Sequence, residues 1–128
     1  MGWCGVGAKP VYRGQKLAVW MYAEGPRCEV EQFLDSLQPR DQRKLSRIMH
    51  EAADYWPLAN RQKCEELHGH PGLFEPKASQ VRVLFFRDSH GDIILTNGFI
   101  KRQDKPPRQE VERALRRWEL WASGEETL

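Results

Sequence analysis

Apolar residues recur at helical spacing in the first half of the chain and predict two helices there. Over residues 30–37 they fall at i, i+3, i+4 and i+7, which forms one stripe on a short helix that Pro39 must end or interrupt. The same period continues from about Arg40 to Trp56, and Pro57 closes this second helix. Cations crowd the other side of its first two turns: Arg40, Arg43, Lys44 and Arg47.

Short apolar runs with β-branched and aromatic residues predict strands on both sides of these helices. Residues 16–22 form the first run, and three more follow at 73–77, 81–86 and 93–100. The turn residues at 88–92 separate the last two runs, so we expect those runs to form an antiparallel hairpin.

The order of these elements indicates the fold class. Pro106 and Pro107 can start a final helix, since proline is well placed in a first turn. Helices early and strands late suggest an α+β domain, in which a curved antiparallel sheet has two N-terminal helices packed on one face, besides the C-terminal helix. The other face would stay open. We expect a flexible leader at 1–14, one domain at 15–122 and an acidic tail at 123–128.

Charge is informative through its distribution, because the net charge is only +2. Residues 101–117 contain seven Lys or Arg against three acidic residues. Lys77 and Arg82 lie inside predicted strands, where a cation must face solvent or meet an anion. Several such cations on one open sheet face would form a phosphate-binding surface.

The cysteines and histidines give weaker signals. Cys4, Cys28 and Cys64 are an odd and widely spaced set, which favours a reducing compartment over a disulfide framework. No apolar run has membrane-spanning length, and the chain reads as cytoplasmic. Cys64 with His68 and His70 gives C-x3-H-x-H spacing, but nothing nearby completes a zinc ligand set, so we expect no metal site.

Several segments together resemble a known family. They are V-E-Q-F-L-D-S-L at 30–37, E-L-H-G-H-P-G-L-F-E at 66–75, V-R-V-L-F-F at 81–86 and N-G-F-I-K-R-Q-D-K-P-P at 97–107. With the helix after the first segment, they are similar to the HigB-like, phage-derived branch of the RelE/ParE toxin superfamily. Its members are toxins of type II toxin-antitoxin pairs. Many cut messenger RNA in the ribosomal A site, while the ParE branch poisons DNA gyrase.

The resemblance implies a chemistry that uses no metal and no cofactor. The ribose 2′-hydroxyl attacks the adjacent phosphorus, and cations neutralise the charge that develops there. By resemblance, Arg82 matches the arginine that contacts the scissile phosphate, and Arg102 matches the cation at the end of the last strand. Lys77 lies where the second strand of the family carries a basic residue, and Lys101 falls in a lysine pair typical of the branch. These four residues are the candidate catalytic set.

Further cations are candidates for RNA contact, and the family implies the partners. The RNA-binding candidates are Arg40, Arg43, Lys44, Arg47 and Lys105. The expected partners are a helix-turn-helix antitoxin, the ribosome and messenger RNA, by resemblance only. No membrane partner is expected.

The sequence also departs from the family pattern. Pro76 removes a backbone donor from the second strand, which predicts a bulge or an edge there. The branch commonly has a histidine where Asn97 stands, so no obvious general base remains, and Lys77 and Lys101 are candidates by default.

Other interpretations stay open at this stage. Arg82 could pair with a carboxylate such as Glu75, and the helix cations could be an ordinary solvated face. The chain could instead be a non-catalytic inhibitor that binds a host protein such as gyrase, or a degenerate homologue that keeps only antitoxin or nucleic-acid binding.

Overall fold

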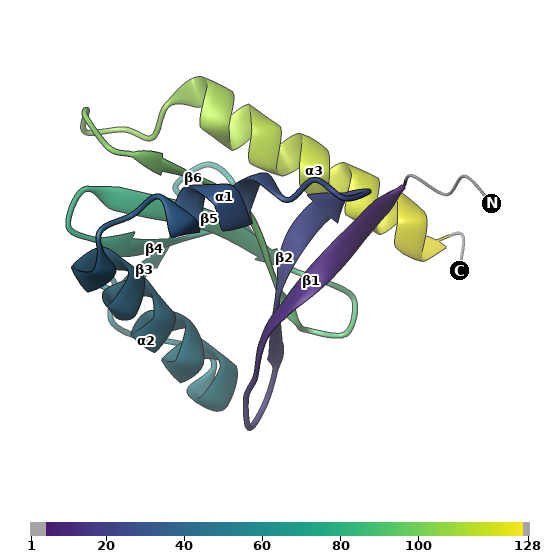
Figure 1. Ribbon diagram of the computed structural model, residues 1–128, viewed down its shortest axis with the longest axis horizontal. Coiled ribbons are helices and arrows are strands. Elements are labelled where there is room, and N and C mark those ends of the chain that lie inside the picture. Colours follow the sequence, from purple (N-terminus) through teal and green to yellow (C-terminus); the bar gives the residue numbers. More distant parts are fainter. Residues whose placement is uncertain (1–4, 127–128) are drawn as a thin grey trace.

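The computed structural model describes residues 5–126, which form a six-stranded sheet with helices on both faces (Figure 1). The strands are β1 (Val6–Arg13), β2 (Ala18–Glu24), β3 (Cys64–Glu66), β4 (Phe74–Ala78), β5 (Val81–Arg87) and β6 (Ile93–Ile100). The helices are α1 (Glu29–Asp35), α2 (Pro39–Tyr55) and α3 (Arg108–Glu126). The α+β class is confirmed, but two strands precede the helices, whereas the sequence predicted only one.

The sheet is mixed, which corrects the expectation of a purely antiparallel one. Its strand order is β1-β2-β6-β5-β4-β3, and all neighbours are antiparallel except β2 and β6. Val19 of β2 lies beside Ile93 of β6 in the parallel pair. The predicted hairpin at 88–92 is confirmed, because β5 and β6 are antiparallel and the amide of Asp88 donates to the carbonyl of Asp92.

Helices α1 and α2 cover one face of the sheet, as the apolar stripes predicted. The stripe of α2 buries Leu45 and Ile48 against strand residues that include Val83 and Phe85. Burial of such side chains contributes about 1.5–3 kcal/mol each, so this layer supplies much of the driving force for folding. Pro39 begins α2, where its missing amide hydrogen costs nothing.

Helix α3 covers the opposite face, so the expected open face is wrong. Its Val111 and Ala114 pack against Leu84 and Phe99, which alternate with the residues that face α1 and α2. The apolar stripe of α3 is buried because this face of the sheet also presents apolar side chains, among them Leu84, Phe86 and Phe99. Lys77 and Arg82, which are register partners on β4 and β5, are therefore confined to the part of this face that α3 leaves uncovered.

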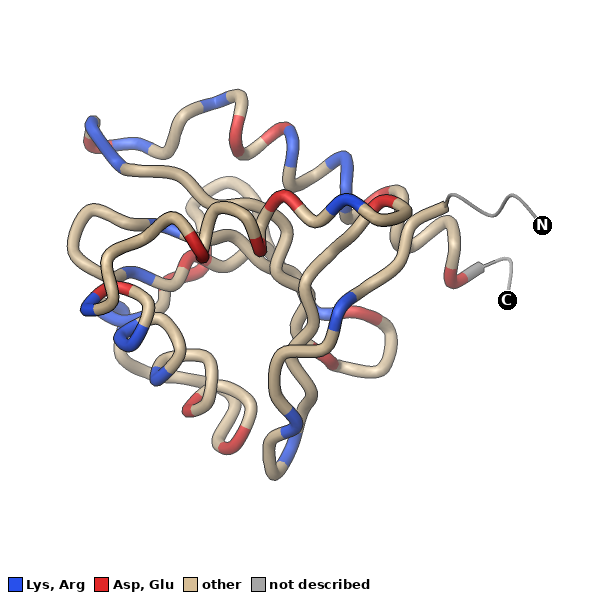
Figure 2. Tube along the Cα trace, viewed as in Figure 1, with Lys and Arg blue, Asp and Glu red and all other residues tan. Residues whose placement is uncertain are grey.

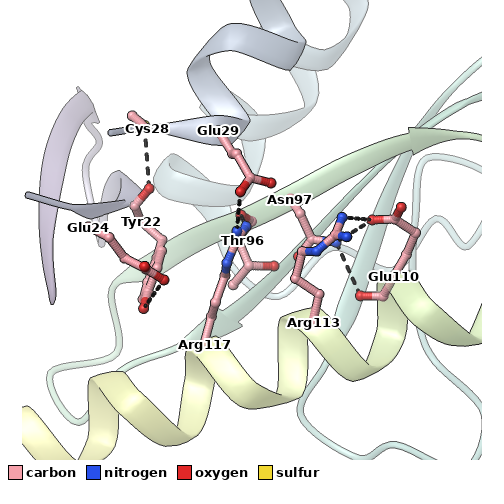
Figure 3. Close-up of polar contacts among 9 residues, drawn as sticks. All are labelled: Tyr22, Glu24, Cys28, Glu29, Thr96, Asn97, Glu110, Arg113 and Arg117. Atoms are coloured by element: carbon pink, nitrogen blue, oxygen red, sulfur yellow. Dashed lines mark hydrogen bonds and ion pairs between the residues drawn. The ribbon is translucent and has the colours of Figure 1, made fainter. Parts of the chain in front are cut away.

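A buried arginine fastens α3 to the sheet (Figure 3). Arg117 is 5% exposed, and its Nη1 donates to the carbonyl of Thr96 on β6 at 2.7 Å. Its Nη2 donates to Glu29 of α1 at 2.8 Å, and its guanidinium lies 5.4 Å from the centre of the Tyr22 ring. The side chain of Arg117 thus joins α3 both to strand β6 and to helix α1.

Regular elements also lie in three segments for which the sequence predicted none. Within the expected leader, residues Val6–Arg13 form β1, and residues 1–4 lie outside the described part. The polar stretch at 59–72 contains the short strand β3. Most of the expected acidic tail at 123–128 is the last turn of α3, while residues 127–128 lie outside the described part.

Strand β4 is an inner strand despite Pro76. It lies between β3 and β5, and its register against β5 is the same before and after the proline. Phe74 pairs with Phe85 and Lys77 pairs with Arg82, whereas Glu75 and Pro76 pair only with β3 and not with β5. The missing donor interrupts the ladder without a bulge or an edge.

Candidate nucleic-acid interface

Arg82 is held by the turn that joins β4 to β5. Its Nη1 donates to the carbonyls of Ser79, at 2.6 Å, and Val81, at 3.0 Å. Ser79 has a φ of 57°, a left-handed conformation that is uncommon outside glycine, so the turn is tightly defined. Arg82 is only 8% exposed, and its Nε is buried without a hydrogen-bond partner among the described residues.

Glu75 is the counterion of Arg82, as the alternative interpretation of the sequence anticipated. Its Oε1 lies 3.7 Å from Nε of Arg82, and the residue is 2% exposed. Its other oxygen has no hydrogen-bond partner among the described residues. Burial raises the pKa of Glu75, although the charges of Arg82, Lys77 and Lys101 act in the opposite direction.

Lys77 and Lys101 complete a cluster of charges around Glu75. Lys77 donates to Oε1 of Glu65 at 2.7 Å, and this hydrogen bond lowers the pKa of Glu65. The backbone amide of Lys101 donates to the carbonyl of Gln80 at 2.7 Å, which places the start of the post-β6 loop beside the β4–β5 turn. We call Glu65, Glu75, Lys77, Arg82 and Lys101 the β4–β5 charge cluster.

Arg102 and Lys105 extend from this cluster into solvent. Both side chains are exposed, and within residues 5–126 neither makes a hydrogen bond or an ion pair. Figure 2 shows Lys and Arg gathered toward one end of the molecule, at the left of the view, where the loop after β6 and the first turns of α2 lie. Such exposed cations can contact a phosphate chain at little desolvation cost.

The cations of α2 lie on the other side of the sheet from the β4–β5 charge cluster. Helix α2 packs on the face that holds Val81 and Val83, whereas Arg82 alternates with them and points to the face of α3. All four predicted α2 cations are exposed: Arg40, Arg43, Lys44 and Arg47. The structure therefore brings Lys77, Arg82 and Lys101 together but keeps the α2 cations as a separate surface.

Asn97 is a packing residue under α3 (Figure 3). It is 2% exposed, and its Nδ2 donates to the backbone carbonyl of Glu110 at 3.1 Å and to its carboxylate at 3.0 Å. Arg113 donates to the same carboxylate at 3.0 Å. Asn97, which stands where the family commonly has a histidine, thus lies in the interface between α3 and the sheet.

The cysteines and histidines of the described part do not assemble into a metal site. Cys28 and Cys64 are free and buried, and burial raises the pKa of the Cys64 thiol to about 12. Among the described residues, no three His, Cys, Asp or Glu side chains are grouped so that they could hold a metal ion. Cys4 lies outside the described part of the chain.

None of the helices in the described part is both long and apolar enough to cross a membrane. Helix α3 illustrates the reason, because its 19 residues include charged side chains throughout.

Comparison with protein families adds an independent observation. The family model described as "Phage derived protein Gp49-like (DUF891)" matches residues 32–119. The chain belongs to the Gp49-like family. Among curated proteins, none matches the chain.

The Gp49-like match contains the whole candidate interface. It begins within α1 and ends within α3, so it includes α2, the β4–β5 charge cluster and the loop after β6. Strands β1 and β2 precede it, although β2 lies beside β6 in the centre of the sheet. The first two strands thus complete a sheet whose functional candidates all lie in the Gp49-like segment.

The sequence did not identify the two acidic residues of the β4–β5 charge cluster as members of the site. Glu65 was not singled out, because no strand was predicted at Cys64–Glu66 and its pairing with β4 could not be inferred. Glu75 was noted only as a counterion. The alternation of side chains along the two strands could have indicated both residues. Cys64 and Phe74 face the core, so the next residues, Glu65 and Glu75, point to the opposite face, where they are register partners.

Proposed function

We propose that the protein is the toxin of a type II toxin-antitoxin pair and that it cuts messenger RNA on the ribosome. The observation that carries the proposal is the β4–β5 charge cluster, in which three cations from different segments surround Glu75. Membership of the Gp49-like family supports it, because that family is phage-derived. The resemblance to phage-derived, HigB-like toxins implies cations at these positions.

The cations have distinct roles in this proposal. Lys101 and Arg102, at the mouth of the cluster, hold the phosphates of the strand. Arg82 faces the scissile phosphate with the edge of its guanidinium and stabilises the charge that develops when the 2′-hydroxyl attacks. Glu75 positions Arg82 from behind, because its 2% exposure keeps it from touching a bound strand.

Proton transfer falls to the lysines in this scheme. Lys77 already shares a hydrogen bond with Glu65, so it lies in a network through which a proton can pass. Lys101 is the second candidate. The chemistry uses only these side chains and the ribose hydroxyl, and the proposal includes no cofactor.

The remaining predicted surfaces belong to the partners in this proposal. The exposed cations of α2 and Lys105 contact ribosomal or messenger RNA. A helix-turn-helix antitoxin neutralises the toxin, by family resemblance.

The experiment is a cleavage assay on ribosomes programmed with a defined message, with cuts mapped by primer extension. Lys101→Ala and Arg102→Ala should each reduce cutting by about 100-fold, the scale at which one electrostatic donor contributes to such a reaction. Arg13→Ala is the matched control, since it removes one exposed positive charge outside the cluster. Cuts at A-site codons that persist in the control and disappear in the two variants support the proposal.

A message left intact by folded wild-type protein would favour a second candidate, a non-catalytic inhibitor that binds a host protein such as gyrase. One observation favours it specifically. Arg82 is nearly buried, its Nη1 already donates to the carbonyls of Ser79 and Val81, and its Nε faces the carboxylate of Glu75 at 3.7 Å. In that case, inhibition should depend on exposed apolar side chains such as Leu120 of α3.

A further inference from the structure

A cavity lies beside the first turns of α3, next to the cations of the post-β6 loop. Its volume is about 590 Å³, within the range of small-molecule sites. Its lining is mostly apolar and comes from three segments, and it consists of Leu67, His68, His70, Lys105, Pro106, Arg108, Val111, Glu112 and Leu115. No role in the cluster described above has been assigned to His68 or His70.

The loop that forms one wall is fixed by its own hydrogen bonds. The amide of Leu67 donates to the carbonyl of Leu73 at 2.8 Å, and the amide of His70 donates to the carbonyl of Leu67 at 3.2 Å. Gly72 donates to a carboxylate oxygen of Glu66 at 2.8 Å and packs so closely on Trp118 that a Cβ would lie 2.5 Å from its ring. The wall that carries the two histidines is therefore preorganised.

The opposite wall is one face of α3. Val111 and Leu115 are one turn apart and present apolar surface, while Arg108 and Glu112, also one turn apart, form an ion pair of 3.0 Å. That pair offsets the charge of Arg108. Lys105 remains as the cation at the cavity that makes no ion pair within the described residues.

We propose that this cavity binds one base of a single-stranded RNA, with Lys105 on an adjacent phosphate. An apolar slot bordered by imidazole rings suits the face of a nucleobase, and histidine is among the side chains on which unpaired bases stack. The cation at its entrance follows Lys101 and Arg102 in the same loop. A strand held at the β4–β5 charge cluster can continue along this loop into the cavity.

This inference rests on the proposed function, because it assigns a place to a base near the cut. The test uses short RNA oligonucleotides whose 2′-hydroxyls are methylated, so that no cut can occur. Binding is measured by fluorescence anisotropy for the intact oligonucleotide and for a series in which each base in turn is removed. One abasic position should weaken binding to the wild-type protein by about tenfold, the lower part of the range for loss of one stacked base.

The variants identify the cavity as the cause. His70→Ala should weaken binding of the intact RNA about tenfold and should make the sensitive abasic position neutral, because both changes remove the same contact. His68→Ala, which changes an exposed side chain, is the second variant and should show the same coupling with a smaller loss. His90→Ala is the matched control, since His90 is an exposed loop histidine outside the cavity.

The outcomes separate this inference from the proposed function. RNA that binds, but loses the same factor at every abasic position in the wild type and in the histidine variants, would overturn the base cavity and leave the toxin proposal standing. Folded wild-type protein that binds no RNA, alone or on ribosomes, would overturn both.

Discussion

Nε of Arg82 lies 3.7 Å from a carboxylate oxygen of Glu75, across two neighbouring strands of the sheet. Both side chains are nearly buried, yet burial raises the pKa of Glu75 more than the nearby cations lower it. Keeping the carboxylate of Glu75 ionised therefore lowers the free energy of unfolding. Such a cost is common at sites where function constrains the residues.

Glu75→Gln should stabilise the fold at neutral pH. Because the pKa of Glu75 is higher in the folded than in the unfolded chain, the folded protein binds more protons, and its stability falls as pH rises above about 4.5, the ordinary pKa. Glutamine has the same shape and no such titration. Thermal unfolding at pH 4.5 to 7 should show a flatter profile for the variant and, at pH 7, a Tm no lower than that of the wild type.

Glu65→Gln is a control for which the change in stability with pH should have the opposite sign. The hydrogen bond from Lys77 lowers the pKa of Glu65, so its contribution is present above the ordinary pKa of 4.5 and is lost as pH falls. The variant should have a slightly lower Tm than the wild type at pH 7, and the two should converge in acid. A lower Tm for Glu75→Gln than for Glu65→Gln at pH 7 would contradict the interpretation of Glu75.

Arg117→Met should weaken the attachment of α3. The change removes the donor to the buried carbonyl of Thr96, which is expected to cost about 2 kcal/mol in the free energy of unfolding. Arg116→Met is the neighbouring control, and because Arg116 is exposed its effect should stay within about 0.5 kcal/mol. Urea denaturation measures both. Equal losses for the two variants would show that the buried position of Arg117 is unimportant.

Gly72→Ala and Gly69→Ala separate two costs in the loop before β4. Both glycines have positive φ, +90° and +82°, but a Cβ at Gly72 would meet Trp118, whereas the space at Gly69 is open. We expect about 1 kcal/mol of destabilisation for Gly69→Ala, from backbone strain alone, and about 3 kcal/mol for Gly72→Ala. Tryptophan fluorescence should change only in Gly72→Ala, because only that variant displaces Trp118.

The salt dependence of RNA binding should report the exposed cations individually. Each phosphate contact that is lost reduces the slope of log K against log salt by about 1. Lys101→Ala and Arg102→Ala should each reduce the slope by that amount, while Arg13→Ala should leave it unchanged. Identical slopes for all three variants would mean that the loop after β6 does not contact the phosphate chain.

The sequence predicted those elements whose apolar period reflects a single covered face. The stripes of α1 and α2 and the hairpin around Asp88 were readable because each depends on local spacing and turn chemistry. Strand β1 was not readable, since an edge strand with one neighbour and the glycine-rich sequence of residues 5–8 has no strong alternation. Strand β3 was hidden in polar residues for a similar reason, because only Cys64 of its three residues is buried.

The relations between distant segments could not be predicted from local pattern. The stripe of α3 was recognised, but nothing in Val111 or Ala114 indicates which face of the sheet they cover, and the open face was inferred incorrectly. The candidate site was predicted in part. Lys77, Arg82 and Lys101 do come together, whereas the near burial of Arg82 depends on Ser79 and Glu75, which lie in other elements.

The parallel pairing of β2 with β6 also affects how the protein is made. Val19 pairs with Ile93, which is synthesised much later, so the centre of the sheet cannot form until β6 has also left the ribosome. Lys101 follows β6 and reaches the β4–β5 turn only once that strand has been placed. If the protein cuts messages on ribosomes as proposed, its charge cluster cannot be assembled while β6 is still inside the ribosome that makes it. Its order of assembly would therefore delay activity until that ribosome has translated β6 and the loop after it and both have left the ribosome.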